Sequence, residues 1–126
     1  SKLRRIELRS GMREEDQRKH ARKPLFCRAA IMRDGHVKPI PARVTEISIA
    51  GVGLLAGTQL FDGAPCSVVL ELPPAIGTPR YLTLNCAVVY SVLTNSAEFR
   101  VGLKFVVIAD DTLTTLRKIV DGVGRR

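Results

Sequence analysis

The sequence predicts an all-β fold, an antiparallel barrel or sandwich followed by a single C-terminal helix. Short runs of strand-forming residues recur from residue 25 to residue 108, and segments containing glycine and proline separate them. No helical pattern alternates with these runs, as a parallel sheet would require. Helical spacing appears only in the tail. With 126 residues, 45% of them hydrophobic, the chain is long enough for one domain with a real core.

Residues 1–23 contain few hydrophobic side chains, and we expect them to form a flexible basic arm. They carry nine Lys/Arg against four Asp/Glu, which is +5 of the total net charge of +8. A basic arm favours anionic partners such as phosphates, nucleic acid or an acidic membrane surface. Pro24 disfavours helix at the residue before it, so the predicted barrel with its C-terminal helix occupies residues 24–126.

The first expected strand is residues 25–33, which end at the hairpin signal Asp34-Gly35. The return segment contains Pro39 and Pro41, which are typical of a strand edge or a bulge.

Past these prolines the apolar and polar residues alternate more clearly. Ile47 and Ile49 are expected on one strand face, with Glu46 and Ser48 together on the other. This pattern predicts a carboxylate and a hydroxyl side by side on the barrel.

Residues 66–72, 81–93 and 99–108 are the remaining predicted strands. In the tail, Asp110 or Asp111 can cap a helix that Gly122 ends. Its apolar face should cover an open end or side of the barrel, and consists of Leu113, Leu116, Ile119 and Val120.

Nothing in the sequence indicates a catalytic or metal-binding centre. The chain has no GxSxG, HExxH or glycine-rich phosphate loop, and its two histidines lie in the arm and beside a turn. The three cysteines, at positions 27, 66 and 86, are far apart and have apolar neighbours. We therefore expect no enzyme activity, no cofactor, and buried thiols in a reducing compartment.

Arg18 and Arg22 stand four positions apart in the arm. A guanidinium offers paired donors to phosphate and to the O6/N7 edge of guanine, and it stacks on flat π systems. The two arginines are candidates for a specific anion site, although arginines at this spacing also occur by chance in a basic run.

The second candidate segment is residues 45–56, with Glu46, Ser48 and Gly51. A carboxylate can accept hydrogen bonds from guanine N1–H and N2–H, and a hydroxyl can donate and accept. A glycine allows a ligand or neighbouring backbone to approach closely. The alternative from the residues alone is the solvated face of a half-buried strand.

The order RKHAR (residues 18–22), EISIAG (46–51) and RVGLKF (100–105) in an all-β chain resembles the PilZ domain family. That family's pattern is RxxxR followed by [D/N]xSxxG. The resemblance covers about residues 17 to 123. It implies a six-stranded antiparallel Greek-key barrel that binds cyclic di-GMP.

By the resemblance, Arg18 and Arg22 grip phosphate and guanine, while Ser48, Gly51 and the residue at position 46 recognise a guanine edge. Arg100 is a further candidate on a neighbouring strand. Glu46 departs from the family's Asp or Asn and reaches one methylene further. The expected function is a receptor whose arm changes conformation on binding and relays the signal, in motility or exopolysaccharide control, to a protein partner or adjacent domain.

Two alternatives stay open at this point. One is a small basic barrel that binds nucleic acid, which the six aromatics and absence of tryptophan do not favour. The other is a PilZ adapter that does not bind the nucleotide. We expect no specific nucleic acid partner and a cytoplasmic location. Because the sequence begins at Ser1 and not at Met, we also expect that the domain can be the cytoplasmic part of a larger or membrane-associated protein. The terminal helix suits either packing on its own barrel or a homodimer.

Overall fold

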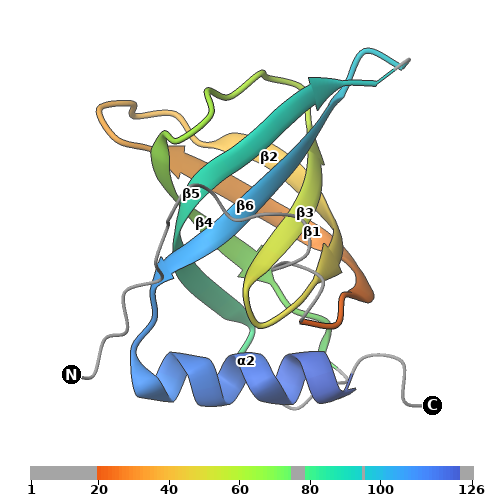
Figure 1. The fold of residues 1–126 in the computed structure, drawn as a ribbon, viewed down its shortest axis with the longest axis vertical. Helices are drawn as coiled ribbons and strands as arrows, with labels where there is room; N and C mark the ends of the chain where they lie inside the picture. Colours follow the sequence, from red (N-terminus) through yellow and green to blue (C-terminus); the bar gives the residue numbers. More distant parts are fainter. Residues whose placement is uncertain (1–19, 75–78, 95, 123–126) are drawn as a thin grey trace.

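The computed structural model describes residues 20–74, 79–94 and 96–122, which form six strands and a C-terminal helix (Figure 1). The predicted all-β fold with a helix at its end is confirmed. The elements are β1 (Lys23–Arg33), β2 (Ile40–Ile47), β3 (Gly51–Ala56), β4 (Pro65–Glu71), β5 (Tyr81–Leu93), β6 (Phe99–Val107) and α2 (Asp110–Gly122).

The strands close into an antiparallel barrel with the order β1-β2-β3-β6-β5-β4. After β3 the chain crosses over so that β4 pairs with β1, which is the Greek-key connection. The structure thus decides between the sandwich and the barrel in favour of the barrel. Closure pairs every strand on both sides and leaves no exposed sheet edge.

The turn glycine and the proline lie at the strand boundaries that the sequence predicts. Gly35 adopts a φ of +79°, which glycine accommodates without strain, in the turn after β1. Pro41 pairs with Ala30 of β1, but the pairing of β2 with β3 begins only at Ala42. The proline therefore borders one strand alone, where its missing N–H leaves no gap in a ladder.

Inward-facing side chains from all six strands fill the barrel. Several of them are completely buried, with a relative exposure of 0%: Ile31, Val68, Leu70, Val101 and Phe105. The alternation of buried and exposed residues along each strand also defines an outer surface. That surface carries most of the polar residues discussed below.

α2 lies across one end of the barrel, as Figure 1 shows. Leu116 and Ile119 are fully buried there, with an exposure of 0% each, so the helix packs on its own barrel. Asp110 and Asp111 occupy its first turn, where carboxylates complement the positive end of the helix dipole. The helix therefore closes an opening that would expose the core. No described helix is long and apolar enough to cross a membrane.

The three thiols are free: Cys66 and Cys86 are buried, and Cys27 is half-buried. Burial, with a smaller contribution from Asp34, raises the pKa of Cys66 to about 11. Burial also raises the pKa of Cys86 and of Cys27. These thiols are poor nucleophiles at neutral pH, because the thiolate is the reactive form.

Candidate ligand-binding groove

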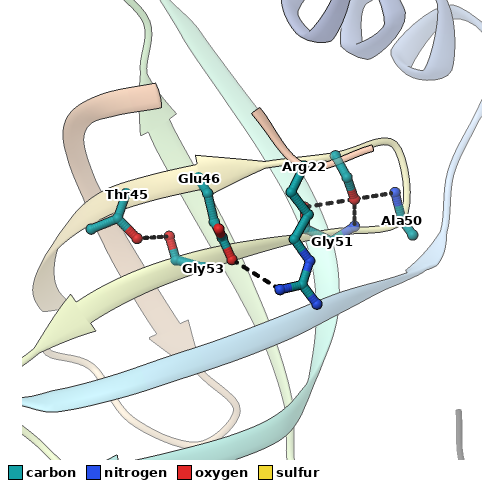
Figure 2. A network of polar contacts seen from close by, with 7 residues as sticks. Arg22, Thr45, Glu46, Ala50, Gly51 and Gly53 are labelled. Carbon is teal, nitrogen blue, oxygen red and sulfur yellow. Dashed lines mark hydrogen bonds and ion pairs between the residues drawn. The ribbon is translucent and has the colours of Figure 1, made fainter. Parts of the chain in front are cut away.

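A β-bulge in β2 turns Glu46 to the outside of the barrel. Val44 pairs with Leu54 and Glu46 pairs with Gly53, so Thr45 is an extra residue in β2. Val44 and Ile47 are consequently both buried, and Glu46 between them faces outward. The Thr45 hydroxyl donates to the Gly53 carbonyl oxygen at 3.3 Å, which holds the bulge in place (Figure 2).

A second bulge, in β5, does the same for Tyr90. Val88 pairs with Leu103 of β6 and Tyr90 pairs with Gly102, which leaves Val89 as the extra residue. Because Gly53 also pairs with Gly102, a single row runs across the outside of four neighbouring strands. In order along β2, β3, β6 and β5, its residues are Glu46, Gly53, Gly102 and Tyr90.

The two glycines of this row leave space that the neighbouring side chains occupy. A Cβ on Gly53 would lie 3.0 Å from Cγ of Glu46, and a Cβ on Gly102 would overlap the ring of Tyr90. Gly102 is buried although it faces outward, because that ring covers it. Larger residues at either position would displace Glu46 or Tyr90 from the barrel surface.

The next row contains Gly51 of β3 and Lys104 of β6, which pair directly. A Cβ on Gly51 would overlap the backbone carbonyl oxygen of Leu103. Gly51 is not among the residues with positive φ, so close approach of the β6 backbone is what requires glycine here. This requirement gives a structural reason for the glycine that the sequence analysis singled out.

Ser48 does not share a strand face with Glu46, and that prediction is wrong. β2 ends at Ile47, and Ser48 lies in the turn to β3 with an exposure of only 6%. Its hydroxyl oxygen accepts hydrogen bonds from the backbone N–H of Ala50 at 3.0 Å and of Gly51 at 3.2 Å. The hydroxyl thus shapes the turn, as serine does in short side-chain-to-backbone turns.

Arg22 reaches the groove from the segment just before β1. Its Nη1 lies 3.4 Å from Oε2 of Glu46 (Figure 2), and the two side chains are 44% and 37% exposed. An exposed pair of this length contributes about 0–1 kcal/mol. An anion can therefore displace Glu46 from the guanidinium at low cost.

Together these residues line one hollow on the barrel surface. Its lining consists of Arg22, Glu46, Ile47, Ser48, Ala50, Gly51, Val52, Gly53, Val89, Tyr90, Gly102, Leu103 and Lys104. We call this hollow the groove. It brings together four of the six predicted site residues.

The other two predicted residues stand apart from it. Arg100 is exposed on β6 between Leu55 and Val92, one row beyond Gly102, and does not line the groove. Arg18 lies outside the described residues.

Sequence reasoning did not single out Gly53, Tyr90, Gly102 or Lys104. Two of them lie in RVGLKF, the segment already noted for its arginine. The bulge that orients Tyr90 has no signal in its own strand, because it depends on the register with β6.

The chain is similar to known proteins in its sequence pattern and in its fold. The family model for the PilZ domain matches residues 16–122. No curated protein shows significant sequence similarity to the chain.

Two solved structures share the fold. The PilZ domain with c-di-GMP of YcgR from Escherichia coli has a TM-score of 0.67 at 12% sequence identity, with 85% of this chain and 91% of that one covered. The Bacillus subtilis inhibitor of motility (MotI/DgrA) has a TM-score of 0.66 at 17% identity over 90% of this chain. The match spans 54% of the Bacillus protein, about half its length.

Proposed function

The chain belongs to the PilZ domain family, and we propose that it is a receptor that binds cyclic di-GMP in the groove. One observation carries the proposal: two bulges and three glycines build an outward-facing hollow in which Arg22 and Glu46 meet. The structural neighbour from Escherichia coli is described with c-di-GMP, which supports the same ligand class for this barrel.

The chemistry of the Arg22–Glu46 pair matches the two kinds of group in the ligand. Arg22 donates to a phosphate or to the O6/N7 edge of guanine. Glu46 accepts from guanine N1–H and N2–H. The ligand replaces the ion pair with hydrogen bonds to each partner, so neither side chain is left without a hydrogen-bond partner.

Glu46 reaches further than the Asp or Asn typical of the family. The extra methylene lets its side chain lie over Gly53 and contact Arg22 at 3.4 Å. We propose that Glu46 keeps this position while Arg22 turns toward the ligand. Ser48 acts through the turn that it stabilises, which fixes Gly51 next to Glu46. Direct contact between Ser48 and the nucleotide stays a prediction.

We further propose that binding draws the basic arm, residues 1–23 with Arg18, onto the barrel. An anionic ligand reduces repulsion among the arm's cations, and the repositioned arm changes the surface that a partner protein or adjacent domain meets. A cytoplasmic receptor of this kind suits a role in motility, because one structural neighbour is described as an inhibitor of motility.

Isothermal titration of cyclic di-GMP against the full chain tests the proposal. We expect binding by the wild type and at least tenfold weaker binding by Arg22→Ala and by Arg18→Ala, since each removes a charge-assisted contact. Arg28→Ala is the matched control, because Arg28 is an exposed strand arginine outside the groove. No heat with the wild type would reject the function, and equal heats for all proteins would reject the arginine grip.

A gel-shift assay with random-sequence DNA separates the nucleic acid alternative. Tight DNA binding at physiological salt, together with no response to cyclic di-GMP, would replace the receptor with a basic nucleic-acid-binding barrel. Nucleotide-insensitive capture of a partner by a chain that does not bind the dinucleotide would identify an adapter instead.

A further inference from the structure

Lys104 is a groove cation without an ion-pair partner in the part of the chain that the structure describes. Leu103 and Phe105 on either side of it face the core, so Lys104 faces outward, half-buried, into the groove. Arg22, by contrast, contacts Glu46. A partly desolvated ammonium with no counter-charge favours binding of an anion at this point.

Tyr90 supplies a flat surface near Lys104. Its ring lies over Gly102, lines the groove and is half-buried. The ring sits on β5, at the opposite border of the groove from Glu46 on β2. Aromatic rings in such positions stack nucleobases, which contributes about 1–3 kcal/mol per base.

The groove therefore has two ends of similar composition. At one end Arg22 contacts the Glu46 carboxylate, which lies over Gly53 of β3. At the other end are Lys104 of β6 and Tyr90 of β5. Each end combines one cation with one group that recognises a base.

We propose that Lys104 and Tyr90 form a second half-site, which takes one phosphate and one guanine of the same ligand. The inference rests on the proposed function and adds to it the reason why a nucleotide with two guanylate units is preferred over one. A mononucleotide has a single base and would fill only one end. The dinucleotide engages a cation at each end.

The first test is titration of cyclic di-GMP against Lys104→Met over a series of salt concentrations. We expect Kd to rise about tenfold, because a charge-assisted contact to phosphate is lost. The slope of log Kd against log salt should fall by about one, as for the loss of one phosphate contact. Lys118→Met is the matched control, since Lys118 is an exposed lysine on α2 and should leave both values unchanged.

The second test uses tyrosine fluorescence. The chain has two tyrosines and no tryptophan, so Tyr81→Phe leaves Tyr90 as the only strong emitter. Stacking of guanine should quench this emission on titration. Tyr90→Phe should keep the affinity within about twofold because the ring remains, whereas Tyr90→Leu should weaken binding about tenfold or more.

The outcomes distinguish a failure of the second half-site from a failure of the proposed function. If the wild type binds and Lys104→Met binds equally well with the same salt slope, the second half-site is wrong and the receptor function stands. Absence of quenching in Tyr81→Phe during confirmed binding would also overturn it. A wild type that does not bind would overturn the proposed function itself. Thermal unfolding of each variant excludes misfolding as the cause of a loss.

Discussion

The outer surface of the barrel carries two clusters built from similar residue types, and one of them surrounds a hollow. The first is the groove, with Arg22, Glu46, Tyr90 and Lys104. The second, which we call the Glu71 cluster, contains Arg28, Glu71, Arg80 and Tyr81 on and beside β1, β4 and β5.

In the Glu71 cluster the charges satisfy one another. Glu71 contacts Nε of Arg28 at 3.3 Å and Nη2 of Arg80 at 3.3 Å. The Arg80 guanidinium also lies 5.4 Å from the centre of the Tyr81 ring. The hydrogen bond to Glu71 raises the pKa of Arg80. The carboxylate, the two guanidinium groups and the ring therefore form one connected set of contacts.

The groove differs in its backbone. Three outward positions beneath it are glycines: Gly51, Gly53 and Gly102. Side chains at these positions would fill the hollow or displace its walls. The difference between the two clusters is that residues without side chains lie beneath the groove, which leaves a hollow there. The following variants test that statement, from the largest expected effect to the smallest.

Gly51→Ala should destabilise the protein most, by about 3 kcal/mol, because the new Cβ overlaps the Leu103 carbonyl oxygen and forces the β3 and β6 backbones apart. Urea unfolding measures the loss. Gly57→Ala is the matched control, since a Cβ there meets nothing within 4 Å. Similar stabilities for the two variants would show that the β3–β6 spacing does not depend on glycine.

Ser48→Ala should reduce stability by about 2 kcal/mol, because two backbone N–H groups lose their acceptor in a partly buried turn. Ser91→Ala removes the acceptor of one N–H, that of Leu60, and should cost about 1 kcal/mol. The two unfolding curves are compared under identical conditions. An unchanged stability for Ser48→Ala with lost ligand binding would restore the serine to direct recognition.

Gly102→Ala should lower the free energy of unfolding by about 1 kcal/mol, since the added methyl displaces the Tyr90 ring and not the backbone. Cyclic di-GMP binding should weaken at the same time. In a double-mutant cycle with Tyr90→Ala, Gly102→Ala should have almost no effect on the free energy of unfolding, because the overlapping ring is gone. Additive effects on the free energy of unfolding would contradict the contact between position 102 and the Tyr90 ring.

Glu71→Gln should have the smallest effect, within about 0.5 kcal/mol, because both ion pairs that it weakens are exposed on the arginine side. The Kd for cyclic di-GMP should not change. Glu46→Gln is the variant to compare with it, since we expect Glu46→Gln to weaken cyclic di-GMP binding. A loss of affinity in Glu71→Gln would mean that the two clusters are coupled and that the distinction drawn above fails.

The barrel could be predicted from the sequence because strand alternation and turn residues are local properties. Residues 81–93 were predicted as one long strand and form β5 with the same bounds. The sequence alone could not show the extra residues Thr45 and Val89, because a bulge exists only relative to the register of a neighbouring strand. Those two residues orient Glu46 and Tyr90.

Ser48 illustrates a signal that was present but interpreted differently. A serine followed three positions later by glycine suits a turn in which the hydroxyl accepts backbone N–H groups. Alternation suggested a strand instead, and β2 ends one residue earlier. Similarly, the segment RVGLKF was noted for Arg100, while its glycine and lysine line the groove.

The glycines beneath the groove also bear on how its shape can be lost by mutation. A single base change converts any glycine codon to an alanine codon, and that methyl group would overlap the Leu103 carbonyl oxygen at position 51 or the Tyr90 ring at position 102. Every arginine and carboxylate would remain in the gene. A loss of ligand binding should therefore be sought in the smallest residues of the groove as well as in the charged ones.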